Sequence, residues 1–117
     1  MKKILIVEDE IITAQSLKLM VERCKHEVCH IAMSGKDAID YITKNQLDLI
    51  LMDISLKGEI DGFETVKRIK KKYDLPIIYT TAFTDDLTME KIQDSGASGI
   101  IEKPYNQLKI CSQLSEL

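Results

Sequence analysis

The amino-acid sequence predicts an α/β fold in which a doubly wound parallel sheet carries helices on both faces. Short apolar runs rich in branched residues recur along the chain, which is typical of buried strands. A segment with the apolar spacing of a helix follows each run. This strict alternation indicates parallel strands joined by right-handed crossovers. The chain holds no internal repeat, linker or low-complexity segment, so we expect residues 1–117 to form one domain.

The predicted strands are short and are bounded by turn or polar residues. Such runs suit strands whose side chains are buried in the core of the domain. In chain order they are ILIV at 4–7, EVCHIA at 27–32, LDLILM at 47–52, PIIYTT at 76–81 and GIIE at 99–102.

Five helices are expected, and in four of them apolar residues mark the helix; in the first they recur at spacings that place them on one face. These residues are Ala14, Leu17, Val21 and Cys24 in the first helix, Ala38, Ile39 and Ile42 in the second, Phe63, Val66, Ile69 and Tyr73 in the third, and Leu108, Cys111 and Leu114 in the fifth, which follows Pro104. Ser34 and Asp37 form a capping box that opens the second helix. Residues 84–86, Thr-Asp-Asp, supply the N-cap and acidic first turn of the fourth helix, which ends ahead of Gly96.

The composition is that of an ordinary globular protein, with 44% hydrophobic and 30% charged residues. A net charge of −3 argues against nucleic-acid binding by this domain. The one basic run, KRIKKKYD at 67–74, falls in the last turns of the third helix, where cations complement the helix dipole, and we interpret it as a solvated face. No apolar run approaches the ~20 residues of a membrane span, and the N-terminal run is too short for a signal peptide. We therefore expect a cytoplasmic protein without membrane association.

The three cysteines, Cys24, Cys29 and Cys111, are odd in number and irregular in spacing, which favours reduced thiols. The stretch CKHEVCH at 24–30 lacks the second ligand pair of a structural zinc site. A helix end leading into a short strand explains it better.

Polar side chains stand at the ends of four predicted strands. Glu8 and Asp9 follow the first strand, Asp53 the third, Thr81 ends the fourth and Lys103 follows the fifth. Ligands of doubly wound sheets bind beyond the carboxyl ends of the strands, so these side chains converge if the first and third strands are neighbours. Each residue alone has an ordinary structural explanation, such as helix capping or solvation. The joint pattern argues for a functional site.

Three carboxylates packed together repel one another unless a cation neutralises them, and their hard oxygens favour Mg²⁺ or a similar ion. Asp53 is the best candidate for a nucleophile because a buried strand fixes its backbone. A divalent cation and Lys103 would bring the formal charge of the site to about zero, which suits an incoming phosphoryl group. Thr81 could donate its hydroxyl to a phosphoryl oxygen, and Ala82 beside it leaves room for the group.

Five motifs together resemble the receiver domain of bacterial and archaeal two-component response regulators, over essentially all of residues 2–117. They are VEDE at 7–10, LILMDI at 49–54, DGFE at 61–64, PIIYTTA at 76–82 and GASGIIEKPY at 96–105. The resemblance implies a flavodoxin-like three-layer sandwich with a five-stranded parallel sheet in the order 2-1-3-4-5.

The resemblance also implies a role for each site residue. Glu8 and Asp9 would be the acidic pair that binds Mg²⁺ (or Mn²⁺) together with the phosphoacceptor Asp53 and the backbone carbonyl of Ser55. By the same resemblance, Thr81 would be the switch hydroxyl, Lys103 would contact the phosphoryl group, and the Lys103–Pro104 peptide would be cis.

A phosphorylation-dependent signalling switch is the implied function, and not an enzyme acting on an external substrate. Asp53 would receive its phosphoryl group from a sensor histidine kinase or a phosphotransfer protein, and the domain would assist its own phosphorylation and dephosphorylation. The face formed by the fourth helix, fifth strand and fifth helix would be read by a downstream effector protein or domain, or by a second copy in a homodimer.

Three positions depart from the family pattern. Glu8 stands where aspartate is commoner, and its extra methylene is expected to reach the metal through water. The loop after Asp53 has Lys57 where proline is frequent, and it is one residue longer than the commonest form. Ile100 occupies the position of the switch tyrosine or phenylalanine. A smaller rearrangement is therefore expected, carried by residues 82–86 and the start of the fourth helix.

Other functions fit the sequence less well. An aspartyl-phosphate hydrolase of haloacid-dehalogenase type would carry a second aspartate at the position of Ser55 and would need a lid domain. A flavodoxin-like cofactor binder would cradle a phosphate with the loop at 8–10, whose EDE sequence repels it. No GxxxxGK[ST] stretch supports nucleotide hydrolysis. The set Asp9, Asp53, Thr81 and Lys103 counts against a degenerate receiver.

Overall fold

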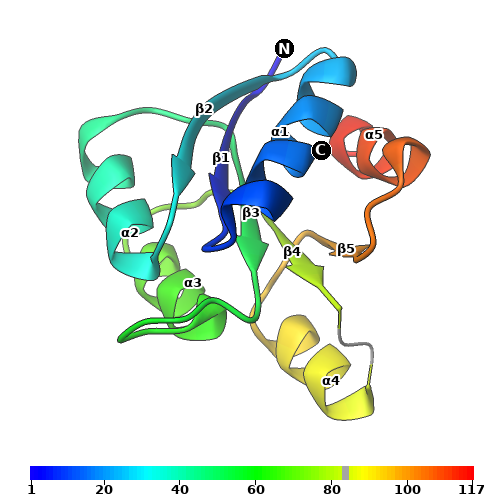
Figure 1. Cartoon of the computed structure of the whole chain (residues 1–117). Coiled ribbons are helices and arrows are strands. Elements are labelled where there is room, and N and C mark those ends of the chain that lie inside the picture. The colour runs from blue at the N-terminus through cyan, green and yellow to red at the C-terminus, as the bar shows by residue number, and fades with distance from the viewer. Residues whose placement is uncertain (83–84) are drawn as a thin grey trace.

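A computed structural model describes residues 1–82 and 85–117 of the chain. Its elements alternate between strands and helices along the whole sequence (Figure 1). In chain order they are β1 (Lys3–Val7), α1 (Ile11–Arg23), β2 (Glu27–Ala32), α2 (Gly35–Lys44), β3 (Leu49–Asp53), α3 (Gly62–Lys70), β4 (Ile77–Thr81), α4 (Asp86–Asp94), β5 (Gly99–Glu102) and α5 (Gln107–Ser115).

The strands form one parallel sheet in the order β2-β1-β3-β4-β5. This arrangement confirms the predicted fold class and strand order. The sequence-predicted strands at 27–32 and 99–102 agree with β2 and β5 residue for residue, whereas β3 begins at Leu49 and includes Asp53. Asp53 belongs to the strand because it pairs with Thr80 of β4.

Helices cover both faces of the sheet, and each face has its own apolar cluster (Figure 1). The helices α1 and α5 pack on one face through Leu17, Val21, Ile110 and Leu114. On the other face, α2, α3 and α4 contribute residues such as Ile42, Val66 and Ile92 to the second cluster. Successive side chains of β1, β3 and β4 belong alternately to the two clusters, as expected of strands that are buried on both faces of the sheet.

The fifth helix forms as predicted, but only part of the apolar set that marked it in the sequence is buried. Leu108 is 81% exposed, whereas Ile110 is fully buried. Asn106 caps α5 by accepting a hydrogen bond from the backbone N–H of Lys109, and from that start Ile110 and Leu114 point to the sheet. Three-residue spacing alone did not distinguish this face from the neighbouring one. Tyr73 likewise lies beyond the end of α3, although it packs against the core.

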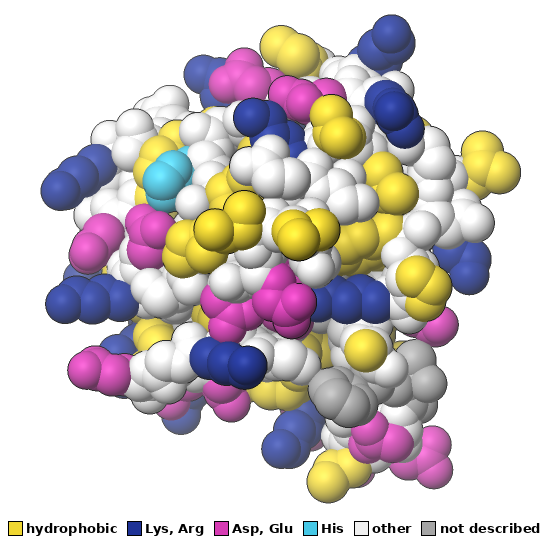
Figure 2. Space-filling view, viewed as in Figure 1, with side chains coloured by type: hydrophobic (Ala, Val, Ile, Leu, Met, Phe, Trp, Pro, Cys, Tyr) yellow, Lys and Arg dark blue, Asp and Glu magenta, His cyan; other side chains and the backbone are white. Residues whose placement is uncertain are grey.

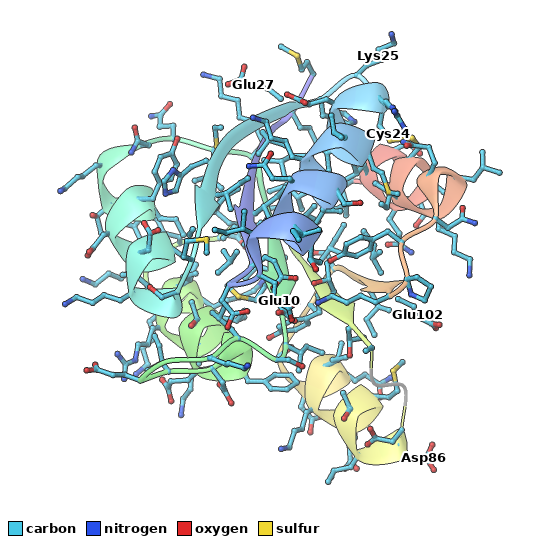
Figure 3. The ribbon with its side chains drawn as sticks, in the orientation of Figure 1. Glu10, Cys24, Lys25, Glu27, Asp86 and Glu102 are labelled. Carbon is cyan, nitrogen blue, oxygen red and sulfur yellow. A yellow bond between two sulfur atoms is a disulfide. The ribbon has the colours of Figure 1, made fainter. Side chains whose placement is uncertain are left out.

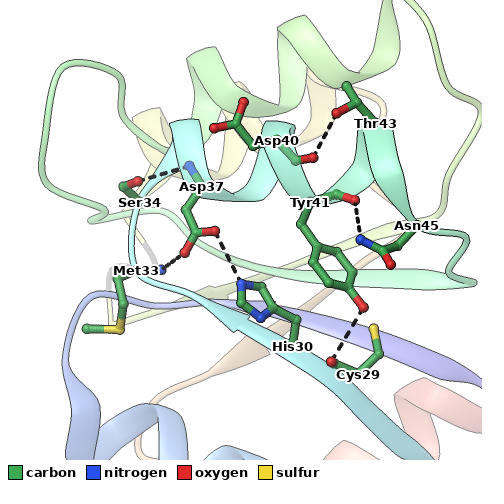
Figure 4. Close-up of polar contacts among 9 residues, drawn as sticks. All are labelled: Cys29, His30, Met33, Ser34, Asp37, Asp40, Tyr41, Thr43 and Asn45. Atoms are coloured by element: carbon green, nitrogen blue, oxygen red, sulfur yellow. Dashed lines mark hydrogen bonds and ion pairs between the residues drawn. The ribbon is translucent and has the colours of Figure 1, made fainter.

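Side-chain caps open most helices. Ser34 accepts a hydrogen bond from the N–H of Asp37 at 3.1 Å, as the capping box predicts, while the Asp37 carboxylate accepts one from the N–H of Met33 (Figure 4). Asp61 caps α3 and Asp85 caps α4 in the same way. Thr84, which we predicted as part of the fourth cap, lies outside the described residues.

Our expectation of three reduced cysteines is wrong, because Cys24 and Cys111 form a disulfide across 87 residues of sequence, and only Cys29 is free. The sulfur of Cys24 lies at the end of α1 beside α5 (Figure 3). Sequence spacing gave no sign of the pair because the fold brings these two helices together on one face of the sheet.

The stretch CKHEVCH holds no metal-like arrangement. His26 accepts a hydrogen bond from the N–H of Lys2, and the Cys29 thiol donates to the carbonyl of Ile4. His30 pairs with Asp37, as Figure 4 shows. These side chains therefore have separate partners, and the stretch joins the end of α1 to β2 as predicted. In the part of the chain that the structure describes, no helix has both the length and the apolar character needed to cross a membrane.

Candidate functional site

Three carboxylates meet at the carboxyl edge of the sheet. Glu8 and Asp9 follow β1, and Asp53 is the last residue of β3. Because Val7 pairs with Met52, the residues next in sequence on the two strands emerge side by side. One ligand oxygen from each of Glu8, Asp9 and Asp53 lies within 4.8 Å of the others, and among the described residues this is the one such group of three acidic, histidine or cysteine side chains.

The three carboxylates differ in exposure. Glu8 is 1% exposed and Asp53 is 3% exposed, whereas Asp9 is only half-buried. Figure 2 shows acidic side chains gathered near the middle of this face, below apolar side chains over the start of α1. Ile11 and Ile12, in the first turn of α1, are among the exposed large apolar residues of the chain.

Lys103 brings the counter-charge. Its Nζ lies 3.0 Å from Oε1 of Glu8 and 3.5 Å from Oδ1 of Asp53. The N–H of Lys103 donates to the carbonyl of Thr81 at 2.8 Å, which fixes the lysine at the end of β5, and the Lys103–Pro104 peptide is cis, as the resemblance implied. Three carboxylates and one ammonium leave two formal negative charges on the site. That excess suits one divalent cation.

The ionisation of Glu8 reflects this crowding. Its pKa is raised from 4.5 to about 7, mainly by burial and also by the neighbouring Asp53, with Lys103 acting in the opposite direction. For Lys103, burial alone would lower the pKa, but Glu8, Tyr105 and Asp53 outweigh it, so the pKa is raised. Without a cation, the site therefore disfavours the ionised form of Glu8 and favours the charged form of Lys103.

Backbone amides of the loop after β3 hold two of the carboxylates. The N–H of Ser55 donates to Oδ1 of Asp53 at 3.0 Å, and the N–H of Lys57 donates to Oδ2 of Asp9 at 3.0 Å. The backbone N–H of Lys57 therefore positions Asp9. A proline, which is frequent at this position in the family, has no N–H and could not make this hydrogen bond.

Gly62 is a residue whose importance the sequence reasoning missed. A Cβ at this position would collide with the carbonyl oxygen of Asp53. The first turn of α3 thus lies directly against the end of β3, and only a glycine permits that approach. The DGFE motif contained the signal, since a glycine behind an N-cap aspartate is unusual in the first turn of a helix.

The predicted switch residues lie on neighbouring strands. Thr81 is fully buried at the end of β4. Ile100 is half-buried in β5 opposite Tyr79 of β4. Of the segment 82–86 predicted to carry the rearrangement, Phe83 and Thr84 lie outside the described residues.

The donor set fits a hard divalent cation. All three candidate side chains offer carboxylate oxygens, two of them buried and therefore costly to leave uncompensated. Mg²⁺ and Mn²⁺ prefer such oxygens, whereas the site has no soft sulfur or imidazole ligand within its acidic group.

Comparisons with known proteins agree with this architecture. AfsQ1, a transcriptional regulatory protein of Streptomyces coelicolor, is 38% identical over 104 residues, which are 89% of this chain and 45% of that protein. The chain therefore spans less than half the length of this relative.

Two solved structures are similar over nearly the whole chain. A two-component response regulator from Clostridium difficile has a TM-score of 0.90 at 28% identity and covers 99% of this chain and 94% of that one. The N-terminal domain of a response regulator/sensory box/GGDEF three-domain protein from Carboxydothermus hydrogenoformans has a TM-score of 0.88 at 32% identity and covers 98% and 92%. The family model of the response regulator receiver domain matches residues 4–115, and the chain belongs to that family.

Proposed function

We propose that the domain is a phosphorylation-dependent switch in which Asp53 accepts a phosphoryl group in the presence of Mg²⁺ or Mn²⁺. The observation that carries this proposal is the acidic group of buried Glu8, half-buried Asp9 and buried Asp53, with Lys103 at its side. A phosphoryl acceptor needs a fixed carboxylate, a cation and a positioned ammonium more than it needs further covalent chemistry.

Asp53 is the acceptor because its strand and the N–H of Ser55 hold its carboxylate in place. An oxygen of Asp53 forms a bond to phosphorus while the bond from phosphorus to the donor breaks, and the electron pair of that bond leaves with the donor. For a phosphohistidine donor of a sensor kinase or phosphotransfer protein, the leaving imidazole then takes up a proton. We propose no external substrate beyond this exchange, so the domain is not an enzyme in the usual sense.

The remaining site residues stabilise the phosphoryl group. The Lys103 ammonium, which contacts Glu8 and Asp53, shifts toward the anionic oxygens of the new phosphoryl group. The Thr81 hydroxyl donates a hydrogen bond to another phosphoryl oxygen. A bound Mg²⁺ or Mn²⁺ would neutralise negative charge on the carboxylates and the phosphoryl oxygens. Asp9, Asp53 and the backbone carbonyl of Ser55 would hold it directly, with Glu8 acting through water.

Docking of the donor is supported by the apolar border of the site. Ile11 is 65% exposed and Ile12 is 86% exposed, and both follow the acidic residues directly in sequence. Exposed apolar side chains of this size commonly mark protein contacts. The output would be read on the face of α4, β5 and α5 by an effector protein, an effector domain or a second copy. A cytoplasmic location fits such partners.

Acetyl phosphate and intact-mass measurement test the proposal. With Mg²⁺, the protein should gain one phosphoryl group, and EDTA should prevent the gain. Asp53→Asn should take up none, whereas Asp40→Asn, at an exposed position of α2, should behave as the wild type. Wild-type uptake by the Asp53→Asn variant would refute the assignment.

A further inference from the structure

We propose that Cys24 and Cys111 form a reversible thiol–disulfide switch that fastens α5 to α1. Cys24 is the C-cap of α1, and Cys111 lies within α5, with 5.3 Å between their Cα atoms. The bond connects α5, the last helix of the domain, to α1, the first, and the ribbon places these two helices on the same side of the sheet (Figure 1). This inference is independent of the phosphoryl site and adds a second input to the domain.

The helices are aligned by contacts that do not depend on the bond. Leu17 and Val21 of α1 share an apolar cluster with Ile110 and Leu114 of α5. The Nζ of Lys2 also donates to the carbonyl of Leu114 at 3.0 Å. The reduced protein would therefore keep its two cysteines close together, so that the bond can form and break in the folded state.

Gln107 aligns the sulfur atoms themselves. Its Nε2 donates to the carbonyl of Met20 at 2.7 Å and lies 3.2 Å from Sγ of Cys24 and 3.4 Å from Sγ of Cys111. One amide from the first turn of α5 thus spans the end of α1 and both sulfurs. Such a contact would orient the two thiols before oxidation, so that the disulfide bond can form without rearrangement of the core.

Access distinguishes this pair from a buried structural staple. Cys24 and Cys111 are both half-buried residues outside the fully buried core, and we infer that a small thiol or disulfide reaches their sulfurs. The core of the domain consists of apolar residues on both faces of the sheet, and neither Cys24 nor Cys111 is among its fully buried residues. We infer that the bond controls the opening of α5 and not the existence of the fold.

The chemical step is thiol–disulfide exchange with the disulfide of a low-molecular-weight thiol, RSSR. One cysteine thiolate attacks RSSR, forms a mixed disulfide and releases RS⁻. The second cysteine thiolate attacks the protein sulfur of that mixed disulfide, forms the Cys24–Cys111 bond and releases the second RS⁻. Two electrons pass from the cysteines to RSSR, and the two thiol protons end on the two RSH products.

Glutathione buffers test reversibility in the folded full chain. The protein is equilibrated with graded ratios of reduced to oxidised glutathione, free thiols are trapped with N-ethylmaleimide, and the intact mass is measured. We expect a titratable conversion between a form with three trapped thiols and a form with one, matching the cysteine count and the single free Cys29. Cys24→Ser and Cys111→Ser should each abolish the pair, and Cys29→Ser should leave it unchanged.

Two outcomes of this titration would overturn the proposal. In one, oxidised glutathione never closes the bond in the folded protein. In the other, the bond is reduced only after addition of denaturant, which would make it a permanent staple. Neither result depends on phosphorylation, so failure of the switch and failure of the proposed phosphoacceptor function are distinguishable.

Amide hydrogen exchange tests the effect on α5. Reduction should speed exchange in residues 107–115 by at least several-fold and lower the midpoint of thermal unfolding by on the order of 10 °C, because the bond closes a long loop. Equal exchange of α5 in both redox forms would refute its control by the bond. Gln107→Ala should slow bond formation, and Gln15→Ala, at an exposed position of α1, serves as its control. An unchanged rate in Gln107→Ala would remove Gln107 from the switch.

Discussion

Glu8 and Asp9 are adjacent in sequence, yet their side chains have different environments. Glu8 is buried against Lys103, and its burial and the neighbouring Asp53 raise its pKa to about 7. Asp9 is half-buried and accepts a hydrogen bond from the backbone of Lys57. Asp9 is therefore more accessible than Glu8 to a hydrated ion that enters from solvent.

We predict that Asp9→Asn weakens Mg²⁺ binding on the order of tenfold and that Glu8→Gln weakens it less. The reason is that Glu8 already shares its charge with Lys103, and its contact to the ion is expected to run through water. Calorimetric titration is the measurement of choice because the chain has no tryptophan. Asp40→Asn provides a control for loss of one negative charge. A larger loss in Glu8→Gln than in Asp9→Asn would reverse this division of roles.

Gly62 gives a second prediction at the residue scale. Gly62→Ala places a methyl group against the carbonyl oxygen of Asp53, and we expect the free energy of unfolding to fall by about 1–3 kcal/mol. The same displacement should slow uptake of phosphoryl from acetyl phosphate. Urea unfolding measures the first effect, with Ser112→Ala at an exposed position of α5 as the control. A variant as stable as the wild type would show that α3 can move away from β3 without cost.

At the scale of elements, helix starts are held by local caps, while the faces of helices are decided by packing. The Asp85 carboxylate accepts hydrogen bonds from the N–H and the hydroxyl of Thr88, both at 2.9 Å. The first turn of α4 therefore depends on an ionised side chain close to the segment in which we expect the signal to travel.

The Asp85 cap predicts a pH dependence of stability. The N–H and hydroxyl of Thr88 lower the pKa of Asp85 below its ordinary value of 3.8. A depressed folded-state pKa stabilises the fold above the ordinary value, and this stabilisation is lost as the pH falls through the lowered pKa. Asp85→Asn keeps the cap without the titration, so its stability should decline less on acidification through this range than that of the wild type. Urea unfolding as a function of pH compares the two, and parallel declines would contradict the prediction.

At the scale of the whole molecule, the site lies at the carboxyl edge of the sheet, between two layers of helices. We expect phosphorylation there to affect mainly β4, β5 and α4. Thr81 and Tyr79 both lie on β4, Ile100 of β5 pairs with Tyr79, and Tyr79 shares an apolar cluster with Ile92 of α4. Ile100 has neither a ring nor a hydroxyl, so it cannot fill the space or offer the polar tip of the aromatic residue common in the family.

We therefore predict a modest response to phosphorylation that is centred on residues 85–105. Beryllofluoride with Mg²⁺, which imitates the phosphoryl group on the acceptor, should shift amide resonances in α4 and β5. The amide resonances at the C-terminal end of α2, away from the carboxyl edge of the sheet, should remain unchanged. Nuclear magnetic resonance spectra before and after addition provide the test. Changes confined to α2 and α3, with residues 85–105 silent, would show that the signal takes another route.

Net charge leads to the last prediction. The domain carries a charge of −3, and its basic run is confined to the end of α3 and the residues just beyond it. Because affinity for DNA grows with the number of neutralised phosphates, the isolated domain should not bind duplex DNA at micromolar protein. Fluorescence anisotropy with a labelled duplex measures this. Salt-sensitive binding would contradict it, and Lys70→Glu would then test whether the end of α3 is responsible.

The sequence by itself determined the features that depend on nearby residues. Apolar runs and helical spacing predicted the strands and helices, Ser34 and Asp37 predicted a cap, and the acidic residues after two strands predicted a site at the carboxyl edge of the sheet. These features follow from local periodicity and from the geometry shared by all parallel sheets.

Only the tertiary structure decided which distant groups meet. The disulfide between Cys24 and Cys111, the approach of Gly62 to Asp53 and the burial of Ile110 instead of Leu108 all depend on how helices pack onto the sheet. Packing is a property of two surfaces, whereas a sequence pattern describes one element at a time. For that reason the carboxylates could be located from the sequence, but the contacts that hold them and the link between the first and last helices could not.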